Sequence, residues 1–177
     1  MNKKNGIYAF VALLVIVLIW VIYQAKRPGI SSSAGDPNAK KAPDFTLQSL
    51  DGNSVSLKQF EGKNVVLLDF WATWCPPCRA AMPELAALEA KYESRGLKVI
   101  SVNQGEDKTT VQNFVRETGY KPLVLLDPGS VGNMYGVRGI PTFVLVDKAG
   151  KLRHSQSGFA PGMGDDLGRR IEELLGS

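Results

Sequence analysis

The motif Cys-Pro-Pro-Cys at positions 75–78 constrains the fold of this chain more than any other feature, because it stands at a predicted junction between a strand and a helix. The apolar run Val65–Trp71 predicts a buried strand, and helix-forming residues follow Cys78. A sulfur at a helix start lies near unpaired N–H groups and the positive end of the helix dipole, which favour the reactive thiolate. Pro76 suits the first helical position, where no N–H is needed. The spacing therefore predicts a redox-active pair.

Cys75 and Cys78 are the only cysteines among the 177 residues, which excludes a framework of several structural disulfides. Structural zinc usually needs four Cys or His ligands, and the single His154 cannot complete such a site. A purely structural bridge between the two cysteines is the alternative, but closing so short a loop gains little entropy. We therefore expect no metal and no separate cofactor, because the Cys75–Cys78 pair is itself the redox centre.

The net charge of +4 resides in the N-terminal region. It equals the charge of Lys3, Lys4, Lys26 and Arg27, and no acidic residue precedes Asp36, so the remaining chain balances 17 basic against 17 acidic residues. A neutral domain lacks the basic surface that nucleic-acid binding requires. We therefore exclude nucleic acids as partners.

An apolar run of 17 residues, Ile7–Tyr23, lies between the basic residues of the N-terminal region. As a helix it would be roughly 26 Å long, close to the minimum for crossing a bilayer. It is longer than the usual core of a cleaved signal peptide, and the small-residue site at Ser32–Ala34 lies far downstream. We therefore predict an uncleaved single-pass membrane anchor over residues 1–23. Two basic side chains flank each end, so the charge pattern leaves its orientation open.

Residues 24–42 contain few large apolar side chains and predict a flexible linker, which leaves one domain of residues 43–177. Within it, Asp51–Asn53 between two alternating segments predicts a β-hairpin. Further strands are predicted at 65–71, 97–102, 123–126, 142–146 and 151–155, with helices after Cys78, around 111–118 and around 167–174. Because strands and helices alternate, the predicted fold class is α/β, with a central mixed sheet flanked by helices on both faces.

The segments Asp69–Cys78 and Gly139–Thr142 together resemble the thioredoxin fold, in which the second segment supplies a cis-proline opposite the cysteines. Further features of the chain resemble one type of protein with this fold, the membrane-anchored ResA/TlpA type of thiol-disulfide oxidoreductase. These features are the apolar N-terminus, the opening Ala42–Phe45, the segment 102–106 and the extra helix and strand before Ile140. The resemblance runs from about residue 42 to the end of the chain. It implies a thioredoxin fold with an N-terminal β-hairpin and an inserted helix and strand, preceded by one transmembrane helix.

The resemblance also implies a partner class and a location. Such a domain lies outside the cytoplasm and reduces disulfides of exported proteins, such as apocytochrome c before haem attachment in cytochrome c-type biogenesis. A membrane thiol donor then reduces the oxidised pair. The same resemblance implies a cytoplasmic N-terminus, with the protein in the cell membrane.

Two other functions remain open on the residues alone. A thiol oxidase would run the same steps in reverse, because direction follows the redox potentials. A copper-binding chaperone for oxidase assembly would use the same two thiolates, which suit Cu(I). A peroxidase is disfavoured, because neither cysteine has the proline and threonine that precede the reactive cysteine of proteins resembling peroxiredoxins.

The predicted catalytic residues are the two cysteines and two carboxylates. Cys75 at the helix start is expected to attack, and Cys78, one turn further in, to resolve the mixed disulfide. Asp69 lies inside an apolar strand, where desolvation should raise its pKa and suit proton exchange with Cys78; a strand-edge aspartate open to water is the alternative. Sequences resembling ResA carry a glutamate where this chain has Ala81, so we expect Asp69 to supply the acid–base help. Glu106 is a second candidate, with an ordinary exposed glutamate as the alternative.

Residues around the cysteines are predicted to contact the substrate. Trp74 precedes the motif directly, and its large amphipathic ring suits a contact surface. A trans Pro141 in an ordinary turn is the alternative for the second segment, although proline entering a strand is unusual away from a sheet edge. The predicted substrate-binding set is Trp74, Pro76, Pro77, Ile140 and Pro141. Arg79 and His154 are expected to be solvated surface residues.

Overall fold

The computed structural model describes residues 13, 15 and 38–176. The predicted anchor over residues 1–23 therefore lies outside the described residues, apart from Leu13 and Val15, which are helical. The chain divides into a unit of residues 1–30 and a unit of residues 31–177, and the second contains the sheet. Within the described ranges, no helix combines the length and apolarity needed to cross a bilayer.

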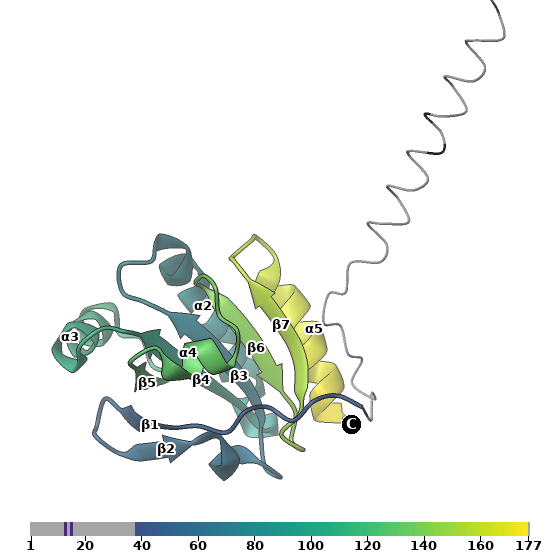
Figure 1. The fold of residues 1–177 in the computed structure, drawn as a ribbon, viewed down its shortest axis with the longest axis horizontal. Helices are drawn as coiled ribbons and strands as arrows, with labels where there is room; N and C mark the ends of the chain where they lie inside the picture. The colour runs from purple at the N-terminus through teal and green to yellow at the C-terminus, as the bar shows by residue number, and fades with distance from the viewer. Residues whose placement is uncertain (1–12, 14, 16–37, 177) are drawn as a thin grey trace, which may run out of the picture. The chain divides into compact units, whose positions relative to one another are not determined.

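Seven strands form one sheet in the order β2-β1-β5-β4-β3-β6-β7 (Figure 1). The central strands β3, β4 and β5 are parallel, whereas β6 and β7 on one side and β1 and β2 on the other are antiparallel to their neighbours. The predicted mixed sheet is therefore confirmed. The strands are β1 (Thr46–Ser49), β2 (Ser54–Ser56), β3 (Val65–Trp71), β4 (Leu97–Gln104), β5 (Leu123–Asp127), β6 (Thr142–Val146) and β7 (Leu152–Ser157).

Helices cover both faces of the sheet, as predicted. Apolar residues of α2 and α5 pack on one face, and α4 packs on the other, in front of the sheet in Figure 1. The helix α3 joins β4 to β5 and packs through Val111 beside the first turns of α2. The helices are α2 (Pro76–Tyr92), α3 (Lys108–Thr118), α4 (Ser130–Met134) and α5 (Met163–Gly176), with short 3-10 turns η1 (Leu57–Phe60) and η2 (Glu93–Arg95).

The strand β3 is buried on both faces, which explains its unbroken apolar sequence. Val66, Leu68 and Phe70 belong to the core beneath α4, whereas Val65 and Leu67 pack against α2 and α5. A polar side chain on this strand is therefore removed from water, whichever face of the sheet it lies on.

The predicted boundaries agree closely for the central strands and less closely at the edges. Residues 65–71 and 142–146 are strands as predicted, and Gly119 ends α3. The strand β4 continues two residues further than predicted, because Gln104 still pairs with Asp127 of β5. The prediction of a solvated His154 is wrong, since its side chain is half-buried on β7 and its Nε2 lies 2.8 Å from Oε1 of Gln156.

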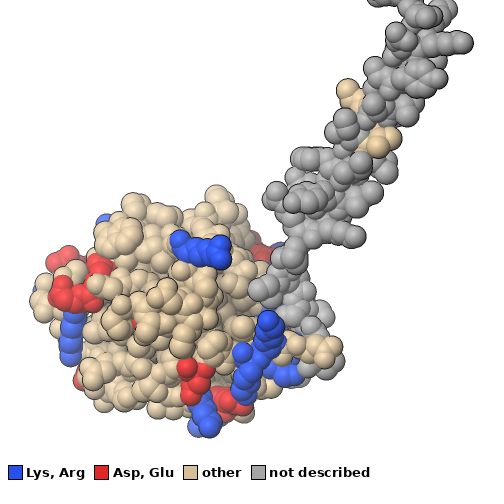
Figure 2. Space-filling model, viewed as in Figure 1, with Lys and Arg blue, Asp and Glu red and all other residues tan. Residues whose placement is uncertain are grey.

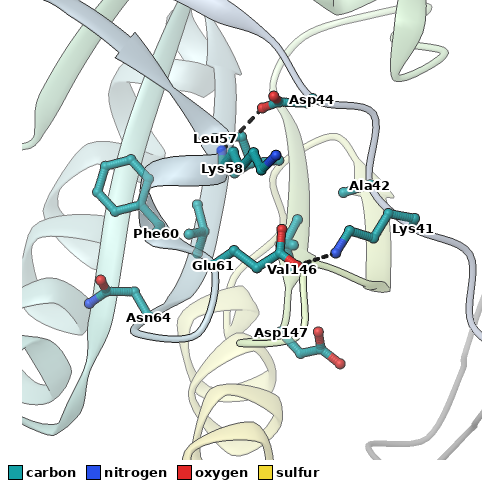
Figure 3. A pocket seen from close by; sticks show the side chains of 12 residues that line it. Lys41, Ala42, Asp44, Leu57, Lys58, Phe60, Glu61, Asn64, Val146 and Asp147 are labelled. Atoms are coloured by element: carbon teal, nitrogen blue, oxygen red, sulfur yellow. Dashed lines mark hydrogen bonds and ion pairs between the residues drawn. The ribbon is translucent and has the colours of Figure 1, made fainter.

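The chain enters the domain slightly before the predicted boundary at residue 43. The N–H of Ala42 donates to the carbonyl of Gly150, and the N–H of Leu152 donates to the carbonyl of Lys40. Lys41 forms an ion pair with Glu61 across a cavity of about 400 Å³, which Figure 3 shows between the entering segment and the η1 turn. Residues 40–42, assigned to the linker from the sequence, are therefore held by the turn between β6 and β7.

The described surface carries charges of both signs. On the face shown in Figure 2, basic and acidic side chains lie mainly near the rim, and most of the central surface is uncharged. Basic and acidic side chains therefore occur together on this face of the domain.

Candidate active site

The two cysteines lie where β3 passes into α2, as the sequence predicts. Cys75 is the N-cap of α2, and Cys78 is within the first turn, with a disulfide joining them across a Cα–Cα distance of 5.3 Å. The backbone N–H of Cys78 donates to Sγ of Cys75 at 3.2 Å. Pro76 occupies the start of the helix. The sulfur of Cys75 therefore receives a backbone donor as well as the field of the helix terminus, which both stabilise a thiolate in the reduced protein.

Asp69 is buried on β3, with 1% of its surface exposed. Burial raises the pKa of Asp69 from its ordinary value near 3.8 to about 7, and a hydrogen bond from Ser101 partly opposes this rise. The Oγ of Ser101 donates to Oδ2 at 3.4 Å, whereas Oδ1 has no hydrogen-bond partner among the residues that the structure describes. The alternative of a strand-edge aspartate open to water is therefore wrong. A carboxyl group with this pKa can exchange protons near neutral pH.

Two further polar residues adjoin Asp69 that sequence reasoning did not identify. Ser101 is directly opposite Asp69 in the parallel pairing of β3 with β4. Its Oγ lies 2.7 Å from the hydroxyl of Tyr120, a residue that also packs in the cluster containing both cysteines. The one signal in the sequence was a serine between the apolar residues Ile100 and Val102 of β4. No local pattern pointed to Tyr120.

Glu106 lies at the carboxyl end of β4 and holds the segment that precedes Cys75. Its carboxylate accepts a hydrogen bond of 2.7 Å from the backbone N–H of Thr73, a second from the hydroxyl of Thr73, and a third of 2.7 Å from Nδ2 of Asn103. The ordinary exposed glutamate is therefore excluded. The neighbouring Asp107 is the N-cap of α3 and accepts from the N–H of Thr110.

The predicted substrate-binding residues differ in exposure. Trp74 is 68% exposed, and Pro76 and Pro77 are also exposed. The Ile140–Pro141 peptide bond is cis, so the alternative of a trans turn proline is wrong. Pro141 is buried, whereas Ile140 is half-buried and packs against the cluster that contains the cysteines. The two segments identified in the sequence therefore meet at one end of the sheet.

The position where the resembling sequences carry a glutamate is apolar in this chain. Ala81 is fully buried and packs with residues of α2 and α5. Arg79 is exposed, as expected, and its guanidinium lies 5.6 Å from the ring centre of Phe114. Within residues 38–176, no group of three or more His, Cys, Asp or Glu side chains could hold a metal ion.

Comparisons with known proteins agree with this geometry. Residues 37–168 match the Redoxin family. The thiol-disulfide oxidoreductase ResA of Halalkalibacterium halodurans is 30% identical over 99% of this chain and 98% of its own length, and ResA of Bacillus cereus is 36% identical over 85% and 87%. The crystal structure of a candidate thiol:disulfide interchange protein DsbE from Chlorobium tepidum has a TM-score of 0.73 and 37% identity, covering 77% of this chain and 96% of that one. The chain therefore belongs to the Redoxin family, among the thiol-disulfide oxidoreductases of the ResA type.

Proposed function

We propose that this oxidoreductase is a disulfide reductase for exported proteins, with Cys75 as the attacking thiolate. The observation that carries the assignment is the position of Cys75 at the N-cap of α2, where its sulfur accepts the N–H of Cys78. A thiolate at this position is stabilised relative to the thiol, and the thiolate is the nucleophile in disulfide exchange.

The reaction follows from the positions of the two sulfurs. The thiolate of Cys75 attacks one sulfur of the substrate disulfide, forms a mixed disulfide and releases one substrate thiolate. The thiol of Cys78 then gives its proton to Asp69 and attacks the sulfur of Cys75, which forms the Cys75–Cys78 disulfide and releases the second substrate sulfur. Two electrons pass from the protein to the substrate. A membrane thiol donor restores the reduced pair.

The surroundings of the cysteines supply the substrate surface in this proposal. Trp74, Pro76 and Pro77 are exposed in the segment that carries the disulfide, and Ile140 packs against the cluster that contains both cysteines. Apocytochrome c before haem attachment is the substrate that we propose, on the resemblance to ResA.

The assignment of the two cysteines is tested by trapping. We expect Cys78→Ser to accumulate covalent mixed disulfides with exported proteins, because the first attack occurs and the second cannot. We expect Cys75→Ser to trap none. Mass spectrometry of affinity-purified adducts identifies the partners, and trapping by Cys75→Ser but not by Cys78→Ser would reverse the assignment. The midpoint potential of the pair against glutathione separates a reductase from a thiol oxidase.

We also propose a cytoplasmic N-terminus, with residues 36–177 outside the cytoplasm. The apolar run Ile7–Tyr23 supports the membrane anchor, and the resemblance to ResA supports its orientation. The charges do not indicate an orientation, because two basic side chains flank each end of the run. A membrane-impermeant thiol reagent should label the reduced cysteines in intact cells. Labelling that appears only after lysis would place the domain in the cytoplasm and remove apocytochrome c as the substrate.

A further inference from the structure

Asp69, Ser101 and Tyr120 form a continuous chain of hydrogen-bonding groups in the interior. The Oγ of Ser101 lies 3.4 Å from Oδ2 of Asp69 and 2.7 Å from the hydroxyl of Tyr120. The exposed fractions are 1% for Asp69, 0% for Ser101 and 8% for Tyr120. Because these groups are removed from water, each depends on the next for its hydrogen bond.

The direction of the hydrogen bonds follows from the number of available protons. An ionised carboxylate only accepts, and a serine hydroxyl has a single proton to donate. When Asp69 is ionised, Ser101 therefore donates to Asp69, and Tyr120 donates to Ser101. This order polarises the serine hydroxyl toward the carboxylate. The hydrogen bonds therefore stabilise the ionised form of Asp69, and protonation of Asp69 removes this stabilisation.

Burial and the hydrogen bond from Ser101 are the causes of the shift in the Asp69 pKa, and Glu89 is a further charged group that acts on this chain, through Tyr120. The neighbour of Asp69 in β6 is Phe143, and Ala81 and Leu85 of α2 pack on the same face of the sheet. Burial is the main cause that raises the pKa of Tyr120 well above its ordinary value, and the charges of Asp69 and Glu89 add to the rise. Tyr120 therefore keeps its proton throughout the range in which Asp69 titrates, and it can serve as a permanent donor.

We propose that Ser101 and Tyr120 are positioning residues for disulfide exchange, which act by setting the proton affinity of the Asp69 carboxylate through this hydrogen-bonded chain. The inference rests on the proposed role of Asp69 as the proton acceptor for Cys78. It gives a role in the reaction to Ser101 of β4 and to Tyr120 of the segment after α3. Neither residue contacts the substrate in this proposal.

The test is a direct measurement of the Asp69 pKa by carboxyl ¹³C NMR in the full-length oxidised protein. Ser101→Ala should raise this pKa by about one pH unit, because the charged form loses its hydrogen bond. Tyr120→Phe keeps the ring packing against Trp71 and should raise it by about half a unit, because Ser101 then loses its donor. An unchanged or lowered pKa in both variants overturns the proposal.

Kinetics provide the second measurement. If the pKa rises by one unit from 7, the ionised fraction at pH 7 falls about fivefold, and resolution of the mixed disulfide should slow by about the same factor. The rate should recover near pH 9, where Asp69 is again ionised. A loss that persists at pH 9 would indicate structural damage and would also overturn the proposal.

Matched controls separate this effect from a general loss of packing. Tyr135→Phe removes a half-buried hydroxyl that donates to the carbonyl of Pro43 on the opposite face of the sheet, and Ser49→Ala removes a buried hydroxyl that accepts from the backbone N–H of Asn53. Both should leave the Asp69 pKa unchanged. The Asp69→Asn variant tests the proposed role of Asp69, which fails if this variant resolves the mixed disulfide at the normal rate. If Asp69→Asn resolves slowly but the Ser101 and Tyr120 variants leave the Asp69 pKa unshifted, only the present inference is refuted.

Discussion

Two buried aspartates near the carboxyl ends of parallel strands have pKa values that are shifted in opposite directions. Asp69 of β3 is 1% exposed and Asp127 of β5 is 2% exposed. Burial raises the pKa of Asp69 to about 7. Burial would also raise the pKa of Asp127, but hydrogen bonds from backbone N–H groups and from Gln104 lower it below its ordinary value.

The difference lies in the number of donors that each carboxylate receives. Asp69 accepts one long hydrogen bond from Ser101, and its Oδ1 accepts none. Asp127 accepts five, because the chain turns into α4 directly above it. Its donors are the backbone N–H groups of Gly129, Val131 and Gly132 and the side chains of Ser130 and Gln104. A well-bonded carboxylate is a structural anchor, whereas a poorly bonded one keeps a proton available for chemistry.

The largest expected effect concerns the reaction. Asp69→Asn keeps the shape of the side chain but cannot take a proton, so we expect resolution of the mixed disulfide to slow by about 10²- to 10⁴-fold. Formation of the mixed disulfide should change much less, because Cys75 makes the first attack. Stopped-flow reduction of a disulfide peptide separates the two steps. An unchanged resolution rate in both Asp69→Asn and the Asp69→Asn/Glu106→Gln double variant would refute the role of Asp69.

The same substitution should stabilise the oxidised protein. The folded-state pKa of Asp69 is raised, so its contribution to stability is fully present below pH 4 and is lost as the pH rises through about 7. Asp69→Asn removes the buried charge and should increase the free energy of unfolding at pH 8 by about 4 kcal/mol, with little change at pH 4. Urea unfolding at both pH values measures this. Equal effects at the two pH values would contradict a titrating carboxylate.

At Asp127 the identical change should have the opposite sign. Both oxygens of Asp127 accept N–H groups, and an amide nitrogen in place of one oxygen would face donors. We expect Asp127→Asn to lower the free energy of unfolding at pH 8 by about 2 kcal/mol. The pKa of Asp127 is lowered, so the stability it contributes is present above pH 4 and is lost as the pH falls through the folded pKa. The variant should therefore approach the stability of the parent protein in acid, and a constant difference would contradict this.

The smallest effect is expected at Glu106, whose charge is not required by its hydrogen bonds. In Glu106→Gln, the amide oxygen can still accept from Thr73 and Asn103, and the new amide group can donate to the Thr73 hydroxyl. We expect Glu106→Gln to slow turnover less than threefold and Glu106→Ala to slow it about tenfold, because only the second releases the segment before Cys75. A severe loss in Glu106→Gln would instead identify Glu106 as a proton-transferring carboxylate.

Much of the fold was predictable from local patterns. Continuous apolar residues predicted β3, the Asp51–Asn53 turn predicted the β1–β2 hairpin, and Gly119 predicted the end of α3. The entry of the chain was less predictable. Residues 40–42 look like a linker in sequence, but their backbone groups bond to the turn between β6 and β7, which no local pattern reveals.

The sequence by itself determined the redox pair and its place at a helix start, because Cys75, Pro76 and Cys78 are neighbours in the chain and their geometry is local. The partners of the carboxylates were decided only by the tertiary structure. Asp69 and Ser101 are 32 residues apart, Ser101 and Tyr120 are 19 apart, and Thr73 and Glu106 are 33 apart. Asp69 and Ser101 meet because β3 and β4 pair in one particular parallel register, and a shift of one residue would turn the Ser101 side chain to the other face of the sheet. Tyr120 reaches Ser101 only because the segment after α3 packs beside these strands.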